Sequence, residues 1–182
     1  MGCVSIVTRH GDRGETSLLY GGRVPKDDLH TEAYGALDEA ISALGLARAL
    51  CTDEVRATRL LDLQRQLFTV GAELATAAEH HDKLETHFAT VTVAMVDQLD
   101  RDVSEIEARL TLPKGFVIPG GDAVAAAIDL GRTFVRRAER RTVALRRAGG
   151  VGNDEVLRYL NRCSDLLFLL AREAEGDRVV AK

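Results

Sequence analysis

The first thirty residues contain groups that could bind phosphate. Residues 8–17 read Thr-Arg-His-Gly-Asp-Arg-Gly-Glu-Thr-Ser, so that Gly11 and Gly14 stand three positions apart. Glycines at this spacing let the backbone turn its N–H groups inward, and the hydroxyls and Arg9 add donors. Lys26, further along the chain, could add a point charge. The segment lacks the Gly-Lys-Ser/Thr of a Walker A motif, and a solvated, flexible loop is the alternative interpretation.

A second candidate is a run of arginines near the C-terminal third of the chain. Residues 131–153 contain seven arginines and a single acid, Glu139. Arg132, Arg136 and Arg140 are four apart, which places them along one face of a helix. Rigid guanidinium forks in a row could hold a polyphosphate. Like charges at this spacing destabilise a helix unless an anion offsets them. The alternative is a solvated helix face on which Glu139 moderates the repulsion.

Three further places carry groups of interest. Asp38 and Glu39 flank an apolar helix face and could pair with an arginine of the basic helix, within or across subunits; otherwise they are surface acids. Phe116 lies in the Pro/Gly-rich segment 113–121 and could close over a flat ligand, or plug the end of a helix bundle. Asn161 stands in a polar run within an apolar helix, which indicates an interior or interfacial network, or simple exposure to solvent.

Histidines and cysteines add little chemistry. His80 and His81 fall near an expected loop, and no Glu-x-x-His pair occurs, which argues against a ferritin-like di-metal bundle. Cys3, Cys51 and Cys163 are odd in number and widely spaced. This pattern favours a reducing compartment over a disulfide scaffold or a zinc site.

Composition limits the class of protein. The 182 residues suffice for one domain with a sizeable core. Aromatic residues are few: the chain has three tyrosines, five phenylalanines and no tryptophan, whereas Ala, Leu, Arg and Glu are abundant. This composition favours a mostly helical chain over a β-sandwich or barrel. A net charge of -4 disfavours a nucleic-acid partner. We see neither a membrane-length apolar run nor a signal-peptide pattern, so we expect a cytoplasmic protein with no membrane partner.

Apolar residues spaced three and four apart predict five helices of roughly 20–25 residues. We expect them at about 31–51, 53–78, around 96–110, 122–147 and 153–176, with residues 79–85 as a loop. The fold class is therefore all-α: a five-helix up-and-down bundle (a four-helix core plus one) with an extended N-terminal loop over residues 1–30. A short strand is expected at residues 4–7.

Within the fourth helix we expect one side to face the core. The residues assigned to that side are Leu130, Phe134 and Ala138. Asp122 is the expected N-cap of this helix, and Asn153 or Asp154 that of the fifth. Gly176 is expected to end the fifth helix.

Taken in order, these segments resemble the PduO-type ATP:cob(I)alamin adenosyltransferase family over nearly the whole chain. The stretches that carry the resemblance are Thr8–Thr16, Gly22–Asp28 with Glu32–Glu39, Phe116–Gly121, Arg132–Arg140 and Tyr159–Asp165. Each stretch is a weak signal alone. Their order on a five-helix pattern makes the resemblance specific.

The resemblance implies an enzyme that transfers the 5′-deoxyadenosyl group of ATP to Co(I) of a reduced corrinoid such as cobalamin, giving adenosylcobalamin and triphosphate. It implies a homotrimer with ATP at the subunit interfaces and Mg²⁺ bound mainly through the ATP phosphates. Residues 1–182 would form a single domain, with the ATP-binding segment at 1–30 and the bundle at 31–176. A cobalamin-dependent mutase and a reductase are the partner proteins that such chemistry suggests.

The resemblance also assigns site residues. In the N-terminal segment, the residues expected near the triphosphate are Thr8, Arg9, Gly11, Asp12, Gly14, Thr16, Ser17 and Lys26. On the last two helices, the residues expected at ATP are Arg132, Arg136, Glu139 and Asn161, with Arg140 continuing the row. Asp38 and Arg132 match a salt bridge that spans the interface, and Phe116 matches the aromatic that helps displace the lower axial ligand of the corrinoid. We expect these three to be the catalytic residues.

Three positions depart from the family pattern. His is common where this chain has Asp129, Asn where it has Ala40, and Arg where it has His30. An acid at 129 lies one helical turn from Arg132 and could pair with it in competition with Asp38.

Two other functions are compatible with the same residues. The first is a non-catalytic ATP/corrinoid-binding sensor or cofactor-delivery module. The second is an RNA-binding bundle that uses the arginine face, which the acidic net charge and the lack of interleaved aromatics disfavour.

Overall fold

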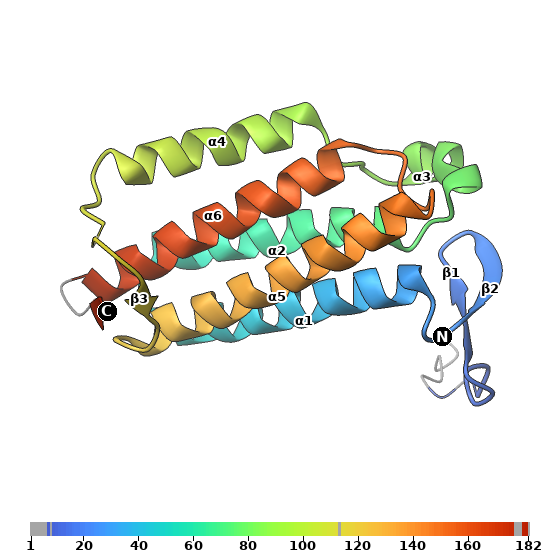
Figure 1. Cartoon of the computed structure of the whole chain (residues 1–182), viewed down its shortest axis with the longest axis horizontal. Coiled ribbons are helices and arrows are strands. Elements are labelled where there is room, and N and C mark those ends of the chain that lie inside the picture. Colours follow the sequence, from blue (N-terminus) through green and yellow to red (C-terminus); the bar gives the residue numbers. More distant parts are fainter. Residues whose placement is uncertain (1–6, 8, 113, 177–179, 182) are drawn as a thin grey trace, which may run out of the picture.

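Five long helices run up and down alongside one another in the computed structural model, which describes residues 7, 9–112, 114–176 and 180–181 (Figure 1). They are α1 (Leu29–Leu50), α2 (Glu54–Leu74), α4 (Val93–Glu107), α5 (Ala123–Arg147) and α6 (Glu155–Glu175). The expected all-α up-and-down bundle is confirmed.

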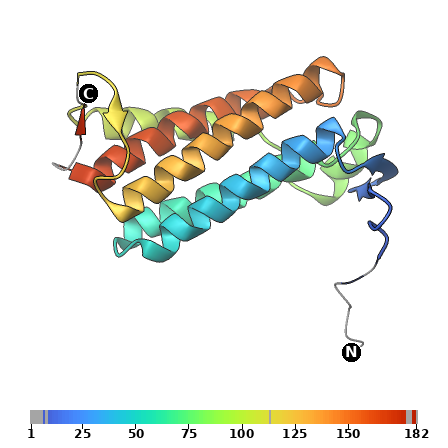
Figure 2. The ribbon, with the colours of Figure 1, turned by 60° about the horizontal axis from the view of Figure 1, so that its bottom comes forward.

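Shorter elements occupy the two ends of the bundle. Strands β1 (Glu15–Leu18) and β2 (Gly21–Pro25) form an antiparallel hairpin that projects beyond the start of α1 (Figures 1 and 2). The 3₁₀ turn η1 (Ala78–His80) and α3 (His81–His87) lie at the same end. At the other end, β3 (Val117–Ile118) pairs with β4 (Val180–Ala181).

Aspartate and asparagine side chains fix where the helices begin. Asp28 accepts a hydrogen bond from the His30 backbone N–H at 2.8 Å, and Asp53 and Asp122 cap α2 and α5 in the same way. For α6 the capping side chain is Asn153, which accepts from the Glu155 N–H at 3.0 Å. The expectations for Asp122 and for the α6 cap are therefore confirmed. Gly176, with φ of 55°, ends α6 as expected.

The centre of the core is the contact between α1 and α5. A Cβ on Gly131 of α5 would lie 2.6 Å from Cδ2 of Leu44 on α1, so only glycine permits this approach. The buried side of α5 continues through Val135 and Ala138. Leu130 is 45 % exposed, so its expected place in the core is wrong: the buried stripe passes through Ile128 and Gly131 on either side of it.

Two expected loops are ordered instead. Residues 79–85 are not a loop, because they form most of η1 and α3. The segment 15–25, expected as an extended loop, is the β1–β2 hairpin. Of the strand expected at 4–7, only Val7 is described, and it is not in a strand.

A buried carboxylate explains the order around α3. Glu73 accepts hydrogen bonds from the Val91 N–H at 2.5 Å and from Asn153 Nδ2 at 3.0 Å, and it contacts His81 Nε2 at 3.2 Å. These bonds join the end of α2 to α3, to the segment before α4 and to the α5–α6 connection. A carboxylate that is only 4 % exposed needs such partners, since an unpaired buried charge is costly.

The remaining expectations concern sulfur and the membrane. Cys51 and Cys163 are free thiols, and burial raises the pKa of Cys163 to about 12, so it is a neutral core residue. In the described part of the chain, no helix combines the length and the apolar character needed to cross a membrane.

The Gly131 contact gives a first prediction. Gly131→Ala should lower the free energy of unfolding by about 1–2 kcal/mol, because overpacking against Leu44 outweighs the gain in helix propensity. Gly35→Ala is the matched control: it is also a helical glycine, but an added Cβ there meets nothing within 4 Å. That control should raise stability by about 0.5–1 kcal/mol. Urea unfolding measures both, and a stabilised Gly131→Ala protein would contradict the packing argument.

Candidate functional site

Residues 9–14, called the glycine loop below, are held at the base of the hairpin. The Lys26 backbone N–H donates to the Gly14 carbonyl at 2.9 Å, and Leu19 N–H donates to the Ala75 carbonyl at the end of α2, also at 2.9 Å. Lys26 Nζ lies 3.0 Å from the point where a Cβ on Gly11 would stand. The ammonium group therefore lies over the loop beside Gly11, where an added Cβ would require the lysine tip to shift.

The backbone of the glycine loop is turned tightly. Arg9 has φ of 60°, which is unusual for a residue other than glycine and marks local strain of the kind that gathers at functional sites. Gly14 has φ of 79°. Arg23 donates to the His10 carbonyl at 2.9 Å and pairs with Glu15 at 3.1 Å, which fixes the loop to β2.

Most residues expected at the triphosphate are present in this region. A cavity of about 600 Å³ is lined in part by Arg9, Asp12 and Arg13. Thr16 is half-buried and Ser17 exposed, both on β1. Thr8 lies outside the described residues.

The arginines of α5 divide into two sets. Arg137 pairs with Glu39, and Arg141 pairs with Glu32 at 3.2 Å, so both bind α5 to α1. Among the described residues, Arg136 and Arg140 have no acidic partner; Arg140 donates only to the Arg136 carbonyl at 3.0 Å. The pairing of Glu39 within the chain confirms one of the two alternatives given for it.

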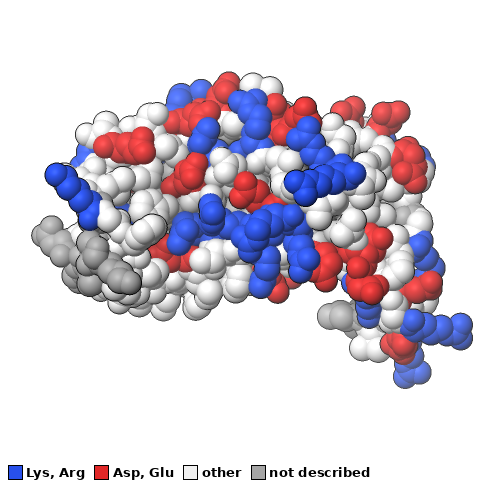
Figure 3. All heavy atoms as spheres, in the orientation of Figure 1, with Lys and Arg blue, Asp and Glu red and all other residues white. Residues whose placement is uncertain are grey.

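The unpaired arginines flank the residue of α5 that contacts α6. Asn161 of α6 is exposed and donates to Glu139 of α5 at 3.2 Å, so this polar pair sits next to Arg136 and Arg140. Basic side chains gather along α5 in the view of Figure 3. A cleft of about 460 Å³ among α4, α5 and α6 is lined by Arg132, Arg136 and Phe168, among others. This face can bind an anion.

Arg132 is held differently from the rest of its row. Its Nε donates to Asp129 Oδ1 at 2.8 Å, which confirms the expected pairing with the acid one turn away. The other oxygen of Asp129 accepts from Arg172 at 2.5 Å, and Arg172 lies 2.9 Å from Glu175. Sequence reasoning missed Arg172 and Glu175. The sequence feature that could have revealed them is a pair of charged residues, three positions apart, on the otherwise apolar side of α6.

Asp38 lies on another surface and makes no ion pair with described residues of its own chain. It borders an apolar groove of about 590 Å³ between α1 and α2, called the α1/α2 groove below. Phe68, Phe88 and Leu19 line this groove and are 64 %, 50 % and 42 % exposed. The expected salt bridge from Asp38 to Arg132 therefore has no counterpart within one chain.

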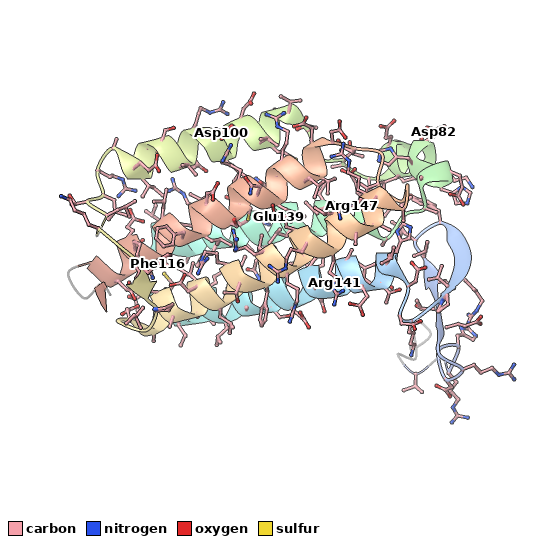
Figure 4. All side chains as sticks on the ribbon, in the orientation of Figure 1. Asp82, Asp100, Phe116, Glu139, Arg141 and Arg147 are labelled. Carbon is pink, nitrogen blue, oxygen red and sulfur yellow. The ribbon has the colours of Figure 1, made fainter. Side chains whose placement is uncertain are left out.

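Phe116 is 86 % exposed, so it does not plug the bundle. The segment that carries it is nevertheless anchored twice. The strand pairing of Val117 with Ala181 holds one side, and Gly121 N–H donates to Glu175 at 3.0 Å on the other. Figure 4 places Phe116 at the β3 end of the bundle, and Arg147 toward the opposite end.

The three groups of candidate residues do not meet within one chain. The hairpin lies at the end where α1 begins and α5 ends, whereas Phe116 lies where α5 begins (Figures 1 and 4). The 25 residues of α5 separate these ends by about 37 Å. Arg136 lies eleven residues before Arg147, about 17 Å from the hairpin end of the helix.

Comparison with known proteins gives consistent matches. The family model described as cobalamin adenosyltransferase matches residues 6–174. A corrinoid adenosyltransferase of Citrobacter freundii is 39 % identical over 171 residues, covering 93 % of this chain and 94 % of the relative. One from Bacillus subtilis is 38 % identical over 174 residues, covering 93 % and 86 %.

A solved structure matches the whole bundle. It is a variant PduO-type ATP:corrinoid adenosyltransferase from Lactobacillus reuteri, complexed with cobalamin and ATP. The TM-score is 0.84 at 32 % sequence identity, over 94 % of this chain and 93 % of that one.

The division of the α5 arginines predicts different effects on stability. Arg137→Ala and Arg141→Ala should each lower the free energy of unfolding by about 0.5–1 kcal/mol, since each removes a partly exposed ion pair to α1. Arg136→Ala and Arg140→Ala should be neutral or stabilising by up to about 0.5 kcal/mol, because like-charge repulsion is relieved. Urea unfolding at low ionic strength measures all four variants. Equal losses would show that the two sets are not distinct.

Proposed function

The chain belongs to the cobalamin adenosyltransferase family, and we propose that its glycine loop and the α6-facing arginines of α5 bind ATP, while Phe116 contacts the corrinoid. The protein is an ATP:corrinoid adenosyltransferase, an enzyme that transfers the adenosyl group of ATP to a corrinoid. The observation that carries the site assignment is the pair of arginines, Arg136 and Arg140, left without acidic partners beside Glu139 and Asn161.

In this proposal the protein acts by positioning and by charge stabilisation. The acceptor, Co(I) of the reduced corrinoid, is itself the nucleophile, so no side chain need attack the 5′ carbon of ATP. The triphosphate that leaves carries the developing negative charge. Lys26, Arg9 and the N–H groups of the glycine loop, with Arg136 from α5, stabilise that charge in the transition state.

The remaining expected residues take supporting roles. In the N-terminal segment these are Thr8, Gly11, Asp12, Gly14, Thr16 and Ser17. Among the described residues, no three His, Cys, Asp or Glu side chains gather as a metal site. We therefore assign Mg²⁺ to the ATP phosphates. Residues 1–30 and 31–176 act as one domain, in which the first segment supplies the loop and the second the bundle.

We further propose that the site is completed by a second copy of the chain, in a homotrimer. Within one chain the glycine loop and Arg136 lie apart along the bundle, so one copy would supply the loop and the next the α5 face. Such a head-to-tail contact closes into a ring. The α1/α2 groove gives an apolar surface for a neighbour to cover, and Asp38 at its border would meet Arg132 of that neighbour.

Phe116 suits the corrinoid side because an exposed aromatic on an anchored loop can cover a flat ring. Displacing the lower axial ligand makes reduction to Co(I) easier, and we assign Phe116 to that step. The electron comes from a reductase, and the product passes to a cobalamin-dependent mutase; both partners are part of the proposal.

The reaction itself is tested with purified protein, ATP, Mg²⁺ and cobalamin under a strong reductant. We expect the absorption spectrum to change to that of adenosylcobalamin over many turnovers. Arg136→Ala should lower kcat/KM for ATP by about 10- to 100-fold, since it removes a charged phosphate contact. Arg137→Ala, the neighbour paired with Glu39, is the matched control and should stay within about twofold. Stoichiometric binding without turnover would instead support a sensor or delivery module.

The shared site is tested by mixing two inactive chains. Lys26→Ala damages the loop and Arg136→Ala damages the α5 face, so each alone should keep at most about a tenth of the wild-type kcat/KM. Mixed assemblies purified through two different affinity tags should regain activity. In any mixed trimer one of the three sites combines two intact halves, giving about one third of wild-type activity, whereas a mixed dimer would give about half. No recovery would place both halves in one chain and contradict the proposal.

A further inference from the structure

Three buried charged side chains stand behind Arg132, and the roles assigned above do not use them. Asp129, Arg172 and Glu175 are each 2 % exposed. Asp129 accepts from Arg132 Nε through Oδ1 and from Arg172 Nη2 through Oδ2, at 2.8 and 2.5 Å. Arg172 Nε lies 2.9 Å from Glu175 Oε2. The four side chains form an alternating row of two cations and two anions with no net charge.

Stability alone does not account for this row. Removing charges from water is expensive, and well-packed apolar residues of similar volume often give equal or greater stability. A buried row of this kind can instead fix one geometry. Glu175 Oε1 also accepts from the Gly121 N–H at 3.0 Å, which ties the inner end of the row to the residue before the α5 cap. The row is therefore fastened to both α5 and α6.

The outer end of the row reaches the candidate site. Arg132 lines the cleft among α4, α5 and α6, and its side chain is 23 % exposed. The guanidinium groups of Arg132 and Arg172 lie 5.8 and 5.1 Å from the centre of the Phe168 ring. Asp129 therefore holds Arg132 through Nε while the ring supports its side chain. Among the described residues, neither terminal nitrogen of Arg132 has an acceptor, so in the proposed assembly one can meet Asp38 of the neighbouring chain and the other can serve a ligand.

We propose that Asp129 is a positioning residue that acts through Arg132: supported by Arg172 and Glu175, it holds the Arg132 guanidinium in the orientation that contacts the triphosphate of ATP as it leaves. This inference rests on the proposed function. A pre-fixed guanidinium loses little freedom when the ligand engages it. The carboxylate also offsets part of the positive charge of Arg132, which weakens attraction to ATP in the ground state.

These two effects predict an unusual kinetic signature. Asp129→Asn keeps the size of the side chain and one acceptor oxygen but removes the charge. We expect kcat to fall about tenfold or more, while the Kd for ATP stays the same or decreases. The reason is that the freed Arg132 still attracts phosphate but no longer holds the orientation that the transition state needs.

A double-mutant cycle separates positioning from a general loss of structure. If Asp129 acts through Arg132, then adding Asp129→Asn to Arg132→Ala should lower kcat no further. Glu73→Gln is the matched control, because it removes another buried carboxylate that has no part in the site. Its kcat per folded protein should equal that of the wild type even if its free energy of unfolding falls.

The outcomes distinguish the two proposals. Wild-type kcat in a folded Asp129→Asn protein overturns the positioning role. So does an Asp129→Asn substitution that lowers kcat by the same factor in the Arg132→Ala background as in the wild type. Absence of product from the wild-type chain overturns the proposed function instead. If the Asp129→Asn protein fails to fold, the double variant Asp129→Asn/Arg172→Gln replaces it, because this variant removes one charge of each sign. It should show the same loss of kcat, with ATP binding no weaker than in the wild type. Wild-type kcat in the double variant also overturns the positioning role.

Discussion

Seven arginines on one central helix are the constraint on which the rest of the structure depends. Helix α5 packs against both α1 and α6, and its glycine at position 131 lets α1 approach closely. A helix so basic can occupy this place only when most of its charge is balanced. Helix α1 balances Arg137 and Arg141 through Glu39 and Glu32. Asp129 balances Arg132 from within α5, and Asp154 before α6 balances Arg146, so four of the seven are paired. Of the arginines without an acidic partner among the described residues, Arg136 lines the cleft that α6 borders, where an anion would offset its charge.

The length of the bundle sets the second constraint. The hairpin is anchored by a backbone hydrogen bond to the end of α2, and the Phe116 segment by its pairing with β4 and by the Gly121 bond to the Glu175 side chain, so neither can move freely toward the middle of α5. Fixed loops at the two ends of a rigid bundle favour precise placement of ligands over adaptability. The same rigidity means that a site needing the glycine loop and the α5 face together requires a second chain. Under the proposed function, the helix length therefore links assembly to catalysis.

The bundle could be predicted from sequence because apolar spacing and capping residues are local signals. Asp122 and Gly176 bound their helices as expected, and the apolar spacing gave all five long helices. The errors arose where long-range contacts decide. Glu73 orders the segment 79–85 through partners as distant as Asn153, and Leu130 lies one residue out of phase with the buried stripe. The site residues were proposed from motif order. Arg172 and Glu175 were not among them, because their partners stand on another helix or loop.

The exposed phenylalanines distinguish two kinds of partner. Phe68 belongs to a continuous apolar surface with Leu19 and Phe88, and a contiguous patch of this kind marks a contact with another protein surface. Phe116 is more exposed, but it stands apart from the α1/α2 groove on a segment fixed at both sides. A single anchored aromatic covers too little area to hold a protein, yet it can cover one face of a flat ligand without losing much freedom on binding. The two surfaces therefore differ in character as well as in place, which supports the proposal that one serves assembly and the other the corrinoid.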